Sequence, residues 1–375
     1  MNRDRIERTL WSQLSARGAV SGDYVATQRV PWPIRLLMGG AGWLGALFFQ
    51  LFLVGTVFVS MRENGVAMAV TGIVMIGIAM LLFRVKAKES GRIAMGQFAL
   101  AMSLGGQGML VVGVGEVIGA NRLVDTAPFW MGVALLEAVL FLLVPDRLHR
   151  FIAALGMWSA LAMAVCIGLG DLVAPRWTAI PVALGVLVAV ALAMVLTFAL
   201  QEAAAAASGR HAMWEPAADA TLLFAVAGAL IVTAFAHPVD LLFGTATARH
   251  APGFWLAGAL IGAELAALVL IECKRLACDP RVSASVLAVA LAFGALMVYA
   301  PAVSAGVLAM AVALRRGSLP WLGLAIGTVL IGFVWYYGTL HWTLLAKSAT
   351  LAGAGVLLLM ARALAIAASR KESVA

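Results

Sequence analysis

Long apolar runs, interrupted by short polar breaks, dominate the hydrophobic pattern of this chain. A helix needs about 20 mostly apolar residues, with a range of roughly 17–25, to cross a lipid bilayer. The run at 302–314 is short for a separate crossing, so ten or eleven spans also fit the pattern. The predicted fold is all-α, a polytopic transmembrane helix bundle of about 12 spans. With the polar breaks as boundaries, the predicted spans are residues 36–60, 65–83, 93–114, 126–144, 151–169, 177–200, 217–236, 253–271, 282–300, 302–314, 319–338 and 348–367.

The composition favours a membrane protein over a soluble one. Hydrophobic residues make up 63% of the 375 residues and charged residues only 12%, against about 45–50% and about 25% in soluble domains. A soluble fold of this composition could not cover itself with polar groups, whereas lipid accepts an apolar exterior. The net charge of +8 comes from short, dispersed basic clusters. These clusters do not form the continuous basic stripe that a nucleic-acid-binding surface needs. We therefore expect the lipid bilayer as a partner and no nucleic acid.

The distribution of basic residues predicts the orientation. If the N-terminus is cytoplasmic, 21 of the 26 Lys and Arg residues fall in cytoplasmic segments, as the positive-inside rule requires. We therefore expect a multi-pass protein of the bacterial inner (cytoplasmic) membrane with both termini in the cytoplasm. The predicted organisation is a cytoplasmic segment 1–34, a bundle 35–367 and a cytoplasmic tail 368–375. The longest break, 201–217, is expected to be a flexible cytoplasmic loop.

The amino-terminal segment predicts a short amphipathic helix. Ile6, Leu10, Trp11 and Leu14 recur at helical spacing, with arginines around them. Such a helix either lies on the cytoplasmic lipid surface or packs against the protein's own loops.

Two predicted spans resemble each other. The spans at 126–144 and 253–271 both have Ala-Pro and Phe-Trp at or just before their start, carry one glutamate in the middle and are followed by basic residues. A parallel repeat of four helices would produce this echo, and so would chance in helical sequence of low complexity.

Four acidic residues within the apolar runs are the candidate functional groups. Glu137 and Glu264 lie deepest, whereas Glu116 and Asp219 lie nearer span ends. An ionised side chain at the helix centre costs about 2.5–3.5 kcal/mol on insertion scales, so such residues are functional candidates. A carboxyl group there either carries protons or, as a neutral acid, bonds to a neighbouring helix. Gln107 and Gln97 likewise could line a polar path or join helices.

Other chemistry finds little support. Gly168-Leu169-Gly170-Asp171 is the G-x-G-D string of intramembrane aspartyl proteases, but a second, well-placed aspartate is missing. The motifs H-E-x-x-H, G-x-S-x-G and Walker A do not occur. Cys273 and Cys278 form a C-x4-C, yet a structural zinc needs four ligands. We predict no catalytic residues, no metal site and no cofactor, and we do not expect an enzyme.

Several motifs carry a resemblance to a known family. They are LWSQLSARGAVSGD, the following PWPIRLLMGGAGWLGALFFQLFLVG, the turn DRLHRF at 146–151, and the ending from Tyr336-Tyr337 to Lys347-Ser348. Over most of its length the chain resembles a family of bacterial membrane proteins described as domain of unknown function 4401. The resemblance implies an inner-membrane protein, often accompanied by a second polytopic membrane protein. It implies no activity and no catalytic residues.

Three functions remain open on these observations. One is a proton-coupled transporter-like or channel-like bundle that uses Glu137 and Glu264. Its alternative is a non-catalytic structural subunit or scaffold of an envelope membrane-protein complex. The third is an enzyme that acts on lipid or lipid-linked substrates, for which only Asp171, Asp240, His237 and His250 could supply a polar site.

Overall fold

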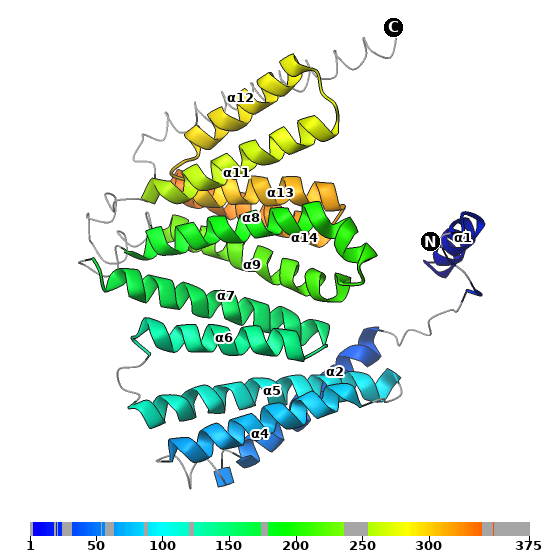
Figure 1. Cartoon of the computed structure of the whole chain (residues 1–375), viewed down its shortest axis with the longest axis vertical. Helices are drawn as coiled ribbons and strands as arrows, with labels where there is room; N and C mark the ends of the chain where they lie inside the picture. The colour runs from blue at the N-terminus through cyan, green and yellow to red at the C-terminus, as the bar shows by residue number, and fades with distance from the viewer. Residues whose placement is uncertain are drawn as a thin grey trace. The chain divides into compact units, whose positions relative to one another are not determined.

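All regular structure in the described part of the chain is helical. The computed structural model describes residues 3–18, 20, 22–24, 32–53, 55–56, 64–85, 89–119, 124–173, 179–235, 254–339 and 348. Within these ranges the chain forms twelve α-helices and no strand (Figure 1), which confirms the predicted all-α fold. The helices are α1 Arg3–Ala16, α2 Trp32–Leu53, α4 Gly65–Arg84, α5 Glu89–Ile118, α6 Ala127–Leu143, α7 Arg147–Gly170, α8 Ala179–Ala207, α9 His211–Phe235, α11 Phe254–Arg275, α12 Pro280–Leu296, α13 Pro301–Arg316 and α14 Leu319–Thr339.

The eleven helices from α2 to α14 fall on the first eleven predicted spans. Seven of the described helices are long and apolar enough to cross a membrane. The run that looked short in the sequence is indeed a short helix, α13, of 16 residues. The predicted span 348–367 and the tail 368–375 lie outside the described residues, apart from Ser348. The chain is thus a helical membrane protein.

Apolar side chains lie on the exposed faces of these helices as well as at the contacts between helices. On α2, Leu37 and Phe48 are 73% and 71% exposed. On α4, Met68 and Met75 are buried, while Leu81 on the same helix is 65% exposed. A helix that is apolar on all sides needs an apolar surrounding. Lipid provides it.

The segment 201–217, expected to be a flexible loop, is mostly helical. The helix α8 continues to Ala207, and α9 already begins at His211. Alanine has the highest helix propensity, so the alanine run extends α8 beyond the apolar span. Gly209 ends the helix in the left-handed region, at a φ of 70°, and the Arg210 amide closes the turn on the Ala205 carbonyl. Hydropathy alone cannot detect a helix that continues beyond an apolar run.

The chain divides into two compact units. One comprises Met1–Asp125 and Phe141–His149, the other Thr126–Leu140 and Arg150–Ala375.

In the first unit, glycines bring helix backbones together. A Cβ placed on Gly72 of α4 would lie 2.5 Å from the Gly106 carbonyl oxygen of α5, and one on Gly106 would lie 2.8 Å from the Gly72 oxygen. Gly65 at the start of α4 and Gly113 toward the end of α5 meet in the same way. Small residues allow this close approach in lipid, where burial of apolar surface does not drive helix association.

The amino-terminal helix α1 packs against a loop of its own unit. The ring of Trp11 lies edge-on to that of Tyr24, with 6.2 Å between centroids. The guanidinium of Arg8 lies 5.8 Å from the centre of the same Tyr24 ring. The second of the two expectations for this helix, packing against the protein's own loops, therefore has support. Contact with lipid stays a prediction.

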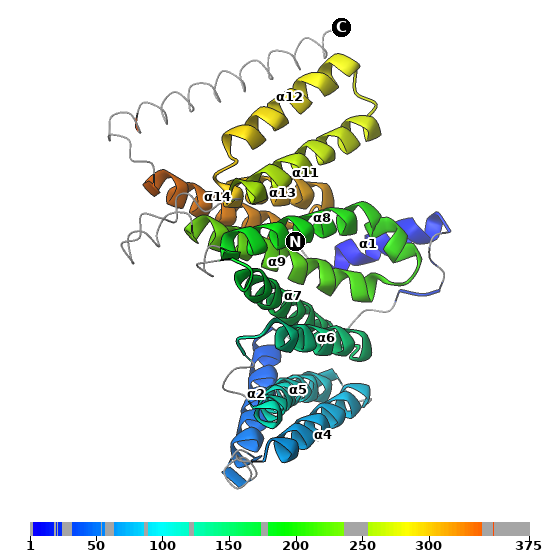
Figure 2. The same cartoon turned by 60° about the vertical axis from the view of Figure 1, so that its left-hand side comes forward.

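The second unit has the larger core. Its buried apolar side chains come from α7, α8, α9, α11, α13 and α14, and these helices are labelled in Figure 2. Trp158 of α7 stacks on Phe224 of α9, with 5.2 Å between the ring centroids. The indole N–H of Trp158 donates a hydrogen bond of 3.0 Å to Thr221. The buried indole is thus packed against a second ring, and its N–H has a hydrogen-bond partner.

Candidate intramembrane carboxyl site

Glu137 and Glu264 occupy equivalent positions in their helices. Each is the eleventh residue of its helix, counted from Ala127 in α6 and from Phe254 in α11. At a rise of about 1.5 Å per residue, each carboxyl group lies about 15 Å from the helix start. Both groups therefore lie in the interior of their helices, away from either end.

The carboxyl group of Glu137 is covered by the next helix. A Cβ placed on Gly156 of α7 would lie 3.2 Å from the Glu137 carboxyl carbon and 3.4 Å from its Oε1. The Oε2 atom is shielded from solvent and has no hydrogen-bond partner among the described residues. The side chain is only half-buried as a whole. The Oε2 atom is thus enclosed although the side chain as a whole is not.

Glu264 lies on the other side of its helix from the α12 contact. That contact is made by Gly262, which meets Gly294 of α12. Almost two turns of about 3.6 residues separate Ala257 from Glu264, so both lie on one face of α11. Ala257 meets Gly185 of α8, so this face points toward α8. The Glu264 Oε2 is also shielded and without a partner among the described residues.

The two glutamates do not form one cluster in the described part of the chain. No hydrogen bond or ion pair joins Glu137 to Glu264 there. Their surroundings differ too, since Glu137 faces the helix that follows it and Glu264 faces away from the helix that follows it. The four-helix repeat therefore stays a prediction, supported by position in the helix and not by packing.

The other two candidates differ in position, since Glu116 lies near the end of α5 and Asp219 is the ninth residue of α9. Glu116 is exposed, and its Cβ packs on Gly65 at the start of α4. Asp219 accepts a 2.8 Å hydrogen bond from the indole N–H of Trp321. The Trp321 ring in turn lies 4.1 Å below the guanidinium of Arg316.

That arginine belongs to a bidentate ion pair. The Nε and Nη2 atoms of Arg316 donate to the two carboxylate oxygens of Glu202, at 2.9 Å and 2.8 Å. The pair joins the end of α13 to α8, and Trp321 with Asp219 extends it to α14 and α9. Asp219 is thus part of a connection between four helices.

The glutamines of α5 also join helices and side chains. Gln97 accepts a 2.8 Å hydrogen bond from the Trp43 indole of α2. Gln107 donates at 3.1 Å to Ser103 on its own helix. The helix-joining interpretation thus accounts for Gln97.

A buried cluster around His149 escaped the sequence analysis. The Ser103 hydroxyl and His149 Nε2 lie 2.8 Å apart, and the edge of the histidine meets Phe83, with 5.7 Å between ring centroids. His149 is only 1% exposed, and its Nδ1 has no partner among the described residues. The available signal was the i, i+4 spacing of Ser103 and Gln107 in an otherwise apolar run.

The described residues contain no group of three or more His, Cys, Asp or Glu that could hold a metal ion. Asp171 is exposed at the end of α7. The remaining polar residues considered for lipid chemistry, His237, Asp240 and His250, lie outside the described residues.

Comparison with known families gave one result. The family model described as "Domain of unknown function (DUF4401)" matches residues 31–365. No curated protein and no solved structure matches the chain.

Proposed function

This chain belongs to the DUF4401 family, whose description assigns no activity, and we propose on the basis of its own geometry that it is a proton-coupled transporter-like or channel-like membrane protein. Glu137 and Glu264 are the proposed proton-carrying groups. The observation that carries this proposal is the pair of mid-helix carboxyl groups, each with one shielded oxygen that has no partner among the described residues.

The cost of charge in hydrocarbon supports this assignment. An ionised carboxylate away from water is expensive unless it is paired. Binding one proton converts it to a neutral acid, which a shielded position tolerates. We infer that each group takes up a proton when it is enclosed and releases it when a helix movement exposes it to water.

The proposal includes an orientation. The described arginines gather at helix ends that the positive-inside rule assigns to the cytoplasm: Arg84 ends α4, Arg147 begins α7, and Arg315 and Arg316 end α13. We propose that the protein lies in a bacterial inner membrane with both termini in the cytoplasm. Single cysteines at these helix ends, probed with a membrane-impermeant thiol reagent in intact cells, should stay unlabelled.

Proton flux across vesicles tests the function. The full chain is reconstituted into liposomes that contain a pH-sensitive dye, and a pH gradient is imposed. We expect wild-type protein to collapse the gradient and Glu137→Gln and Glu264→Gln to slow this at least tenfold. Glu215→Gln, at the fifth residue of α9, is the matched control and should keep wild-type flux. Wild-type flux no faster than that of protein-free vesicles would contradict the proposal.

A second function is favoured by a different observation. Several polar side chains of the described part tie helices together, as Trp43 does with Gln97 and Arg316 does with Glu202. A rigid bundle of this kind suits a non-catalytic subunit or scaffold of an envelope membrane-protein complex.

Purification from the native membrane separates the two functions. The tagged protein is extracted in lipid particles, and the proteins that accompany it are identified by mass spectrometry. A second polytopic membrane protein in fixed stoichiometry, together with absent proton flux, supports the subunit. A protein that purifies alone and conducts protons supports transport.

A further inference from the structure

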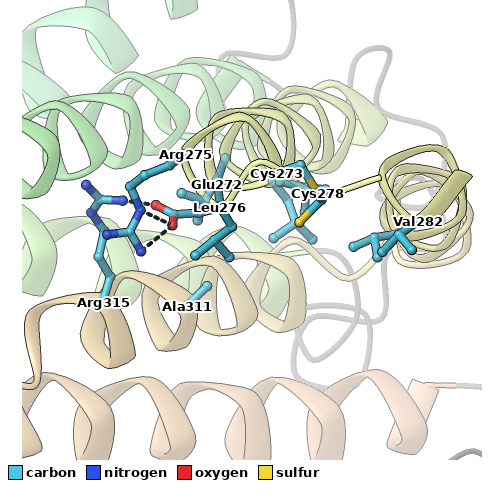
Figure 3. A pocket seen from close by; sticks show the side chains of 12 residues that line it. Glu272, Cys273, Arg275, Leu276, Cys278, Val282, Ala311 and Arg315 are labelled. Atoms are coloured by element: carbon cyan, nitrogen blue, oxygen red, sulfur yellow. Dashed lines mark hydrogen bonds and ion pairs between the residues drawn. The ribbon is translucent and has the colours of Figure 1, made fainter. Parts of the chain in front are cut away.

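A cavity of about 410 Å³ lies between α11, α12 and α13. Its size falls within the range of about 300–1,000 Å³ that small-molecule sites occupy. Figure 3 shows Glu272, Arg275 and Arg315 gathered at one side of it, and Val282 of α12 across the gap from the end of α11. The cavity is separate from both glutamates of the proposed proton path, neither of which lines it.

Backbone contacts at one end of the helix pair explain why the other end is open. Gly258 meets the Val298 backbone, and Gly262 meets Gly294, so α11 and α12 touch near the start of α11. Toward the connecting turn the two helices are separated by the cavity, which Val269 and Val286 line from opposite sides.

The turn that connects the helices is firmly built. The Cys278 amide donates to the Cys273 carbonyl at 3.0 Å, and the Ala277 amide to the Lys274 carbonyl at 3.3 Å. This is the Schellman pattern, with Ala277 in the left-handed region at a φ of 50°. The Asp279 side chain then accepts from the Arg281 amide at 2.7 Å and caps α12. The turn beside the cavity is therefore held in place by these hydrogen bonds.

The polar side of the cavity carries excess positive charge. Arg275 donates to Glu272 at 2.7 Å, and Arg315 forms an ion pair with the same carboxylate. Two guanidinium groups thus share one carboxylate, which leaves one positive charge. The side chain of Arg275 is 57% exposed, so it can turn toward a bound anion.

The remaining wall is apolar and extends inward along the helices. Leu265 lies about two turns deeper on α11 than Glu272, and Val282 and Val286 line the opposite side. Val282 and Val286 are themselves half-exposed, so the cavity opens to the lipid side. An anion without an apolar tail would leave this wall unused.

We propose that this cavity binds one anionic phospholipid, with its phosphate on Arg275 and Arg315 and an acyl chain between α11 and α12. Basic pockets between transmembrane helices recognise lipid phosphates in this way. Arginine suits the task because its planar fork matches phosphate oxygens in pairs. This lipid site is independent of proton transport, because none of the proposed proton-carrying groups lines it.

Lipid titration tests the proposal. The full chain in a neutral detergent is titrated with phosphatidylglycerol or with phosphatidylcholine of the same acyl chains. Bound lipid is counted by native mass spectrometry, and the melting temperature is followed by tryptophan fluorescence. We expect phosphatidylglycerol to bind and to stabilise the protein, and phosphatidylcholine to do so at least fivefold more weakly.

Two variants probe the two parts of the site. Arg315→Gln removes one cation and leaves the pair between Glu272 and Arg275, and we expect about fivefold weaker binding of phosphatidylglycerol. Ala311→Phe fills the cavity without a change in charge and should abolish the preference. Arg210→Gln, an exposed arginine after α8, is the matched control and should bind as wild type does.

Three outcomes would overturn the proposal. Equal binding of the two lipids would remove the charge preference. Unchanged binding in Ala311→Phe, with that variant folded, would place the lipid elsewhere. Equal stabilisation by glycerol 3-phosphate alone would make this a site for a free phosphate and not for a lipid.

Discussion

The carboxyl group of Glu137 lies directly over Gly156 of the neighbouring helix α7. A Cβ on Gly156 would lie 3.2 Å from the carboxyl carbon and 3.3 Å from Cγ of that glutamate. These distances are shorter than ordinary van der Waals contacts. Gly156 therefore provides the space in which the carboxyl group is enclosed, and the two residues are expected to depend on each other.

Substitution of Gly156 tests this dependence. Gly156→Ala should destabilise the protein by about 1–3 kcal/mol through overpacking, and the loss should largely vanish in the Glu137→Ala background. Thermal unfolding of the four proteins of this cycle measures the coupling. Gly132→Ala is the control, because a Cβ there meets nothing within 4 Å. An equal loss in both backgrounds would show that the carboxyl group is not what fills the space.

Replacing Glu264 by leucine should stabilise the fold while it abolishes proton flux. Removal of a shielded polar atom without a partner relieves a cost of about 1–3 kcal/mol, and Oε2 of Glu264 is such an atom within the described residues. Thermal unfolding in neutral detergent measures the gain. Glu202→Leu provides the contrast and should destabilise, because it leaves Arg316 without its carboxylate. A loss of stability in Glu264→Leu would reveal a structural partner for the carboxyl group.

The buried Ser103 hydroxyl should contribute to stability through His149. In Ser103→Ala the imidazole Nε2 loses the partner at 2.8 Å, and an unsatisfied buried polar group costs about 1–3 kcal/mol. Ser159→Ala is the matched control, because that exposed hydroxyl bonds only within its own helix, to Leu155. Equal melting temperatures of the two variants would mean that the histidine finds another partner.

The helices could be predicted from the sequence because lipid leaves the backbone few choices. Inside hydrocarbon every backbone amide must be bonded within the chain, so an apolar run of sufficient length becomes a helix. Outside the membrane this constraint ends. The error at 201–217 arose there, since the alanine run is helical for reasons of propensity and not of hydropathy.

The site could be predicted only in part, for a related reason. An ionisable residue within an apolar run stands out, and Glu137 and Glu264 are indeed mid-helix residues. What covers each of them depends on which helices pack together, and span order does not give this. His149 was missed because it follows Asp146 and Arg147 in a polar break, and only the packing of α5 and Phe83 against it makes it a buried residue.

The connection from Glu202 through Arg316 to Trp321 should depend on the shape of the arginine and not only on its charge. Lysine in place of Arg316 keeps the charge but cannot donate two parallel hydrogen bonds or lie flat over the indole ring. We expect Arg316→Lys to lower the free energy of unfolding by about 1.5–3 kcal/mol, the contribution of hydrogen bonds to charged groups.

Thermal unfolding measures this loss, and Arg281→Lys, an exposed arginine at the start of α12, is the control. Trp321→Phe keeps the ring under the guanidinium but removes the hydrogen bond to Asp219, so its effect should be smaller than that of Arg316→Lys. If Arg316→Lys and the control unfold at the same temperature, the bidentate geometry contributes nothing to stability. The rigidity that favours a scaffold would then lose this support, and the balance would shift toward a bundle whose helices move during transport.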